Sequence, residues 1–150
     1  MFHKRKKLSK FAVAQKQGFR SGLEVIINQQ LQENKIIGQY EQFEIPYNIP
    51  TTKHTYTPDF ILPNGIIIET KGRFIQQDRK KHILIKQQHP ELDIRFVFQN
   101  MNQKISKNSK TTYEMWCIKN NFKYAESRIP NAWLNEPVKK LPIIVNKKKK

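Results

Sequence analysis

Apolar positions along the chain recur with two spacings, one typical of helices and one typical of strands. Between residues 21 and 34 they fall three, four and eight positions apart, which is the spacing of one buried helical face. Residues 76–89 are predicted to form a second helix that stops before Pro90. Residues 92–98 alternate apolar and polar side chains, as strands do. Helices and strands therefore alternate, which predicts an α/β domain.

Other segments complete a central mixed sheet flanked by helices. Two prolines, Pro46 and Pro50, hold the chain extended and deny it a helix, so residues 45–51 are a candidate bridge between two structural halves. Further elements are predicted as a strand over 39–45, a helix over 111–120 opened by the capping box Thr111–Glu114, an edge strand over 122–124 and a short helix from Pro130.

Residues 57–71 predict a hairpin that carries carboxylates. If Pro63-Asn64-Gly65 is a three-residue loop with its glycine in the left-handed position, the strand register follows from it. Asp59 then lies opposite Glu69, with Cβ atoms about 4.5–5.5 Å apart. A two-residue Asn64-Gly65 turn would instead make these two residues diagonal neighbours. With the longer loop the other cross-strand pairs are Leu62 with Ile66, Ile61 with Ile67, and Phe60 with Ile68.

Two opposed carboxylates indicate a cation between them, because like charges placed so destabilise a sheet. Strand alternation puts Ile67, Glu69 and Lys71 on one face, so the ammonium group lies beside the acids. Such a set predicts a metal-dependent hydrolytic site. A solvated rim of charged strand ends is the structural alternative. The apolar flanks, the register set by the turn and the position of the lysine argue against it.

Phosphodiester hydrolysis fits these residues. It needs a nucleophilic water, neutralisation of the charge that builds on phosphorus, and a stabilised leaving oxygen, and two metal ions can provide all three. Hard oxygen ligands favour Mg²⁺ or Mn²⁺, two per site. Asp59 would bridge the ions and Glu69 would hold one, helped by the Thr70 carbonyl. Lys71 would orient the attacking water or stabilise the transition state.

The chain carries 28 basic and 12 acidic residues, a net charge of +16, which predicts a polyanionic partner and favours nucleic acid over a membrane. The basic segments 1–18 and 138–150 are expected to be a flexible arm and a tail around a domain over 19–137, with disorder at 147–150. The candidate phosphate contacts are Arg20, Arg73, Arg79, Lys80, Lys81, His82, Lys104, Lys107 and Lys110.

Several residue types limit the chemistry. A single cysteine, Cys117, excludes an internal disulfide and multi-cysteine zinc sites, and we expect it to be buried. The N-terminus lacks the apolar stretch of a secretory signal, so a cytoplasmic protein without a small-molecule cofactor is expected. Trp116 and Trp133 are expected in the core. His82 is expected on a polar helix face or as a phosphate donor, since no second ligand is spaced for zinc.

A further acid comes from the first helix. Glu24 lies at the edge of the apolar face and can point toward the sheet. However, Ser21-Gly22-Leu23-Glu24 is itself a capping box, in which the glutamate would only satisfy a backbone N–H group. From the spacing alone both roles remain open.

Five segments of the chain closely resemble the phage endonuclease I family, the phage-encoded Holliday-junction resolvases of the PD-(D/E)xK nuclease superfamily. The resemblance is colinear from about Gly18 to Pro137, and the motifs are long enough to be specific. Residues 39–41 depart from it, since they replace a more acidic stretch. The matching segments are residues 19–24, 56–60, 62–66, 69–72 and 78–82, and residues 89–95 fit as well.

This resemblance implies a restriction-endonuclease-like fold in a domain-swapped homodimer, with the segment near 45–51 crossing between two composite lobes. Each active site would combine Glu24 of one subunit with Asp59, Glu69 and Lys71 of the other. The implied substrate is branched DNA, above all four-way junctions, cut by paired nicks in opposing strands within the host cytoplasm. The implied role is to resolve branched replication intermediates and to help degrade host DNA.

Two other functions fit parts of the pattern. A non-catalytic basic DNA- or RNA-binding protein would need no Mg²⁺ and would tolerate Asp59→Asn. Acids in a phosphate-binding groove weaken binding unless a metal is present, which argues against that function. A nuclease of the same superfamily that cuts ordinary duplex DNA would cleave a linear duplex as well as a junction of equal sequence.

Overall fold

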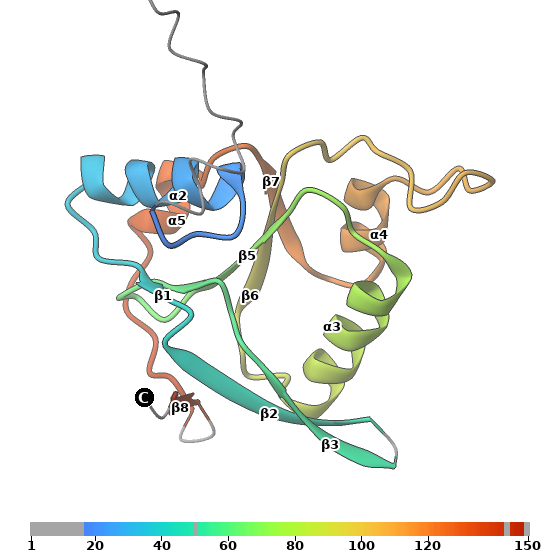
Figure 1. Ribbon diagram of the computed structural model, residues 1–150, viewed down its shortest axis with the longest axis horizontal. Coiled ribbons are helices and arrows are strands. Elements are labelled where there is room, and N and C mark those ends of the chain that lie inside the picture. Colours follow the sequence, from blue (N-terminus) through green and yellow to red (C-terminus); the bar gives the residue numbers. More distant parts are fainter. Residues whose placement is uncertain (1–16, 50, 143–144, 149–150) are drawn as a thin grey trace, which may run out of the picture.

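Five strands form a mixed central sheet in the order β1-β4-β5-β6-β7, in a computed structural model that describes residues 17–49, 51–142 and 145–148 (Figure 1). The pairs β1–β4 and β4–β5 are antiparallel, whereas β5–β6 and β6–β7 are parallel. The strands are β1 (Gln39–Tyr40), β4 (Phe60–Ile61), β5 (Ile67–Lys71), β6 (Ile94–Phe98) and β7 (Lys123–Glu126). The predicted mixed α/β architecture is confirmed.

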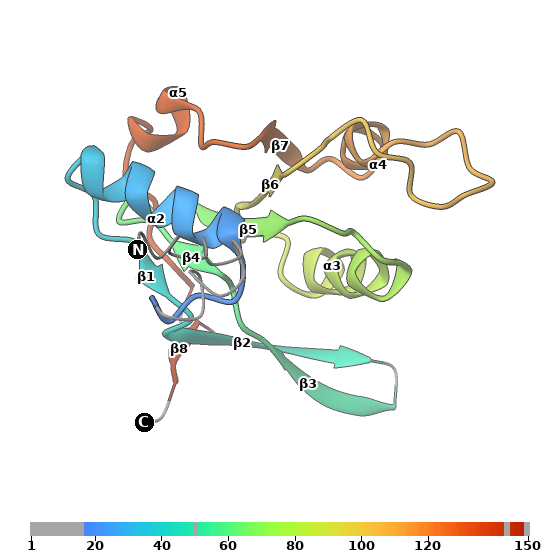
Figure 2. The same cartoon turned by 45° about the horizontal axis from the view of Figure 1, so that its top comes forward.

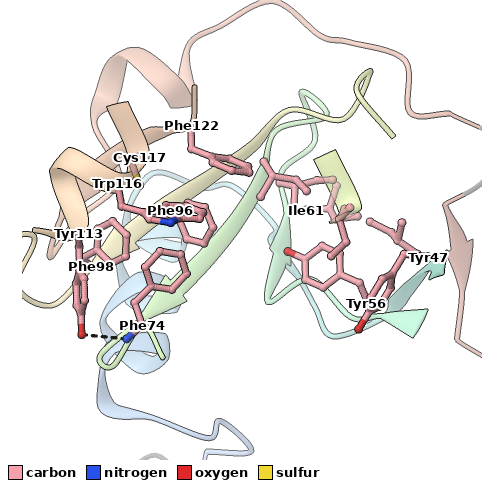
Figure 3. Close-up of a cluster of buried hydrophobic side chains, with 14 residues drawn as sticks. Tyr47, Tyr56, Ile61, Phe74, Phe96, Phe98, Tyr113, Trp116, Cys117 and Phe122 are labelled. Atoms are coloured by element: carbon pink, nitrogen blue, oxygen red, sulfur yellow. Dashed lines mark hydrogen bonds between the residues drawn. The ribbon is translucent and has the colours of Figure 1, made fainter. Parts of the chain in front are cut away.

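Helices cover both faces of this sheet, as Figures 1 and 2 show. Helices α3 (Gln76–Gln88) and α4 (Tyr113–Lys119) pack on one face, where Phe74, Phe96 and Trp116 lie in an aromatic cluster (Figure 3). Helices α2 (Gly22–Glu33) and α5 (Asn131–Leu134) pack on the other face. Strand β6, between β5 and β7, is buried on both sides, because each face of the sheet has its own hydrophobic core.

The predicted hairpin is confirmed in its register. Phe60 pairs with Ile68 and Ile61 with Ile67, as the three-residue loop requires. The Gly65 N–H group donates to the Leu62 carbonyl at 2.9 Å, and Gly65 has the φ of +88° that the loop needs. Loop chemistry next to the strands therefore decides which residues face each other, and the two-residue turn is excluded.

A second sheet holds the segment that was predicted to be a bridge. Strand β2 (Phe43–Ile49) lies between β3 (Thr52–Tyr56) and β8 (Asn146–Lys147). Within this single chain, residues 45–49 form an antiparallel hairpin with β3 that extends below the central sheet (Figure 2); Pro50 lies outside the described residues. β3 was not predicted, because its first four residues are exposed and polar, and only the pairing with β2 makes it a strand.

Several element boundaries differ from the prediction. The strand expected over 39–45 is interrupted at Glu41, whose positive φ of +47° turns the chain between β1 and β2. Helix α4 begins one residue later than its capping box implied, since the hydroxyl of Thr112, not Thr111, accepts from the Met115 N–H group. The disorder predicted over 147–150 is wrong for Lys147, which pairs with Phe43. Residues 149–150 and 1–16 lie outside the described part.

The predicted core residues are buried. Cys117 has no exposed surface, and burial raises the pKa of its thiol to about 12, so it is an inert apolar residue here. Trp116 and Trp133 are buried in the two cores on opposite faces of the sheet. Among the described residues, no helix is both long and apolar enough to cross a membrane.

Candidate active site

The candidate catalytic residues meet near the end of β5. Asp59 directly precedes β4, Glu69 and Lys71 belong to β5, and Glu24 lies in the first turn of α2. The register places Phe60 opposite Ile68, so Asp59 and Glu69 follow directly after the last pair of this ladder. Both carboxylates are buried, with only 5% and 4% of their surface exposed. A solvated rim is therefore excluded.

Asp59 is held by the strand opposite to it. Its Oδ2 atom accepts two hydrogen bonds, from the N–H group and from the hydroxyl of Thr70, both at 2.8 Å. Burial raises the pKa of Asp59 well above its usual range, and repulsion from Glu69 adds to the increase. The hydrogen bonds from Thr70 oppose this rise by stabilising the ionised form. The sequence predicted a role for the carbonyl of Thr70, but these contacts use its N–H and hydroxyl groups.

Glu69 has different partners on its two oxygens. The hydroxyl of Tyr56, at the end of β3, donates to Oε2 at 2.5 Å, a charge-assisted hydrogen bond. The Lys71 ammonium lies 3.6 Å from Oε1. Burial raises the pKa of Glu69, whereas Lys71 and the Tyr56 hydrogen bond act to lower it. The Tyr56 hydroxyl thus fixes one oxygen and leaves the other facing the lysine.

Lys71 stays charged although it is largely buried. Burial alone would lower its pKa, but Glu69, Asp78 and Asp59 outweigh this effect and raise it. The Asp78 carboxylate, in the first turn of α3, lies 3.4 Å from the ammonium nitrogen. Lys71 therefore provides a fixed positive charge between the sheet and α3, on the face predicted by strand alternation.

Glu24 satisfies a backbone N–H group before the helix and also lies near Asp59. Its Oε2 atom accepts from the Arg20 N–H group at 2.7 Å, which satisfies backbone just before the helix, while the Ser21 hydroxyl accepts from the Glu24 N–H group. Glu24 Oε2 also accepts a hydrogen bond from the Tyr40 hydroxyl, at 2.7 Å. Glu24 is also close enough to Asp59 to raise the pKa of that carboxyl. The backbone contact therefore does not prevent Glu24 from lying close to the buried acids.

Three partners of the site were not assigned from sequence. Tyr56 and Asp78 lie within segments that carried the resemblance, whereas Tyr40 lies in the stretch that departs from it, and no spacing rule points to any of the three. Tyr56 ends strand β3, three positions before Asp59. The other residues of β3 are polar and exposed, so the sequence would place Tyr56 at the surface as well. Only the packing of the second sheet against α3 turns Tyr56 inward.

His82 was expected on a polar helix face or at a phosphate, and both expectations are wrong in this fold. Its side chain has no exposed surface and lies between the rings of Tyr56 and Phe96. Its Nε2 atom is 4.0 Å from Glu69 Oε1, and neither ring nitrogen has a hydrogen-bond partner among the described residues. Burial, with Lys81 and Lys71 nearby, lowers the pKa of His82 well below its usual value, so the ring is neutral.

The other predicted DNA contacts divide into free and engaged cations. Arg20 forms an ion pair with Glu41. The guanidinium of Arg79 donates to the carbonyl oxygens of Phe74 at 2.5 Å and Ile105 at 3.3 Å, so it supports the fold. Lys81 lies 5.5 Å from the ring centre of Tyr56. The remaining cations, all exposed, are Arg73, Lys80, Lys104, Lys107 and Lys110.

The acids present a donor set that suits a hard divalent cation. Asp59 and Glu69 are buried and repel each other, so a divalent cation would relieve their mutual repulsion. Within the described residues, no group of three or more His, Cys, Asp or Glu side chains converges as a complete metal cage. Mg²⁺ keeps several water ligands and needs only one or two protein carboxylates, so this pair fits it.

A mixed sheet covered by helices, with buried acids and a lysine at the end of one strand, is the arrangement of an α/β nuclease domain. The family model described as Phage endonuclease I matches residues 6–150. Endonuclease I of Escherichia phage T7 is 52% identical over 124 residues, 83% of each chain. Endodeoxyribonuclease 1 of Enterobacteria phage T3 is 51% identical over 136 residues, 91% of this chain and 90% of the relative.

The chain therefore belongs to the phage endonuclease I family. The resemblance inferred from its motifs is confirmed, and with it the class of enzyme, an endodeoxyribonuclease.

Proposed function

We propose that this endodeoxyribonuclease is structure-selective and resolves four-way and other branched DNA by paired nicks in opposing strands, leaving 5′-phosphate and 3′-hydroxyl ends. The observation that carries the proposal is the buried pair Asp59 and Glu69 beside Lys71, in a chain of net charge +16. The positive charge attracts a polyanion, whereas buried acids would weaken binding in a purely DNA-binding protein. The family and its relatives support DNA as the substrate.

Mg²⁺ or Mn²⁺, two ions per site, is the proposed cofactor. Asp59 and Glu69 would hold it, with Glu24 and the carbonyl of Thr70 as further ligands. When bound, it would supply an activated water and neutralise charge on the phosphate and the leaving oxygen. Thr70 orients Asp59 through its N–H and hydroxyl groups, and Tyr56 orients Glu69.

The proposed role of Lys71 is to stabilise the transition state. Its ammonium group is held between Glu69 and Asp78, so it does not have to be ordered when the substrate arrives. A fixed positive charge in a site that excludes water stabilises charge on phosphorus more strongly than the same charge would in bulk water. Lys71 can also donate a hydrogen bond to the attacking water.

A homodimer is the proposed assembly, because paired nicks need two active sites in a fixed relation and twofold symmetry provides this. The proposed exchange takes place at residues 45–51. If the connection between β2 and β3 extends, the N-terminal part of one copy (α2, β1 and β2) can pack on the rest of another copy. It would then make between two chains the contacts that it makes here within one chain. Glu24 of one subunit would then serve the Asp59 of its partner. Light scattering of the purified protein should give the mass of a dimer, and a monomer at all concentrations would contradict this assembly.

The test compares an end-labelled immobile four-way junction with a linear duplex of equal sequence, each with and without Mg²⁺. We expect symmetric nicks in the junction that require Mg²⁺, little cleavage of the duplex, and no cleavage by Glu69→Gln. Equal cleavage of both substrates would indicate a duplex-cutting nuclease. Tight binding without any cleavage would indicate a non-catalytic binding protein.

Asp59→Ala separates binding from chemistry. It removes one buried negative charge from the site, so cleavage should be lost while junction binding is kept or strengthened, since repulsion of the phosphates falls. Gel-shift titration and cleavage assays of the same preparation measure both. Cleavage by the purified variant in Mg²⁺ at the wild-type rate would refute the assigned role.

A further inference from the structure

A cationic pocket lies next to the active site and is separate from it. It has a volume of about 460 Å³ and lies between residues 73–75, which follow β5, and the loop of residues 103–107. Phe74 and Tyr113 form its buried floor, and the Phe74 N–H group donates to the Tyr113 hydroxyl at 3.1 Å (Figure 3). The pocket therefore rests on the aromatic core that supports the catalytic strand.

Positive charge dominates the rim of this pocket. Arg73, Lys104 and Lys107 contribute to its lining, and all three side chains are exposed. No aspartate or glutamate lines it, and within the described part of the chain none of the three cations takes part in an ion pair. Three unpaired charges around one concavity repel one another, so an anion bound there would relieve that repulsion.

Hydrogen bonds brace the wall of residues 103–107, and one side chain connects the two walls. Lys104 pairs with Thr112 in a β-bridge, and the Ile105 N–H group donates to the Thr111 carbonyl at 2.9 Å. Arg79 spans the walls, because its guanidinium donates to a carbonyl oxygen on each side, that of Phe74 and that of Ile105. The cations are thus carried on a braced loop, which lowers the entropic cost of binding a ligand.

The position of the pocket identifies its ligand. Arg73 is two residues beyond Lys71, so their Cα atoms are at most about 7 Å apart. A DNA strand whose phosphate is cut beside Lys71 brings its next phosphates into this region. We propose that the pocket is a phosphate subsite, in which Arg73, Lys104 and Lys107 hold the backbone of the cleaved strand close to the cut. This inference rests on the proposed nuclease function.

Salt dependence of binding tests the proposal. The probe is an uncleaved four-way junction, and its affinity is measured by fluorescence anisotropy over a range of salt without a divalent cation. The double variant Lys104→Gln, Lys107→Gln is compared with Lys35→Gln, Lys119→Gln, which removes the same charge from exposed residues outside the pocket. Two lost phosphate contacts should lower the slope of log affinity against log salt by about 1.8, and the control should leave it nearly unchanged.

A second measurement locates the contact. Single neutral methylphosphonate linkages are placed in turn along the cleaved strand, and binding by wild type and by the Lys104, Lys107 double variant is compared. One position close to the cut should weaken the wild type by roughly tenfold and leave the double variant unaffected, since the same contact is already missing. Effects that add at every position would overturn the subsite.

The two failures are distinguishable. If the wild type cleaves the junction in Mg²⁺ but both double variants change the salt slope equally, the pocket is not a subsite and the proposed function stands. If the wild type neither binds nor cleaves the junction, the proposed function fails first.

Discussion

Replacing Tyr56 with phenylalanine removes one oxygen atom and with it the hydrogen bond that orients Glu69. The hydroxyl lies 2.5 Å from Glu69 Oε2, and both side chains are buried, so water does not replace the lost donor. A hydrogen bond to a charged group contributes about 1.5–3 kcal/mol. If the whole contribution supports the ionised, oriented glutamate, cleavage should fall roughly 10- to 150-fold.

Single-turnover cleavage of a four-way junction in Mg²⁺ measures this loss. Binding of the uncut junction should be unchanged, because Tyr56 has only 1% of its surface exposed and does not reach the DNA. Tyr47→Phe is the matched control, since Tyr47 is a buried tyrosine of the same hairpin whose hydroxyl bonds to no other described residue. Urea unfolding of both variants shows whether stability has changed.

Two outcomes would refute the reasoning. Wild-type cleavage by Tyr56→Phe would mean that Glu69 keeps its position and charge without the hydroxyl. An equal loss in Tyr56→Phe and Tyr47→Phe would mean that packing of the hairpin, and not the hydrogen bond to Glu69, is what cleavage depends on.

Two further predictions concern stability. Gly65→Ala should destabilise the fold by at least about 1–2 kcal/mol, because φ is +88° and a Cβ atom would lie 2.5 Å from the Lys139 carbonyl oxygen; unchanged urea unfolding would contradict this. Burial alone would raise the pKa of Asp93, but hydrogen bonds from Arg95 and Lys139 lower it to about 2. The ionised Asp93 carboxylate therefore contributes to the stability of the fold above pH 3.8, its ordinary pKa, and this contribution is lost as the pH falls toward 2. The stability difference between wild type and Asp93→Asn should shrink over that range, and a constant difference would exclude the ion pair as its source.

The hairpin that carries Asp59 and Glu69 could be predicted from local sequence alone. Its register depends on the loop at residues 63–65 and on strand alternation, both of which act between neighbours in the chain. Asp59 beside Glu69, and Lys71 on the same face, follow from these local rules. The helix that carries Glu24 also follows from apolar spacing, since Ile27 and Leu31 of the predicted face are fully buried. Ile26, expected on the same face, is 46% exposed, so the spacing predicted the helix better than it predicted the buried face.

Local rules failed where pairing or burial came from distant residues. β3 is polar and exposed along most of its length, so its own sequence does not predict a strand; β2 makes it one. His82 and Arg79 stand in a basic helical segment that favours a surface role. The tertiary structure buries the histidine against the aromatic core and directs the arginine to backbone carbonyls.

The sequence by itself determined the α/β class, the hairpin with its opposed acids, and the family, since each depends on short segments whose residues act together. Only the tertiary structure decided which side chains surround those acids. Tyr56, Tyr40 and Asp78 reach the site from three different elements, and no spacing along the chain encodes their meeting. The physical reason is that burial is a property of the packed fold: the desolvation that raises the pKa values of Asp59 and Glu69 exists only once both sheets and α3 have closed around them.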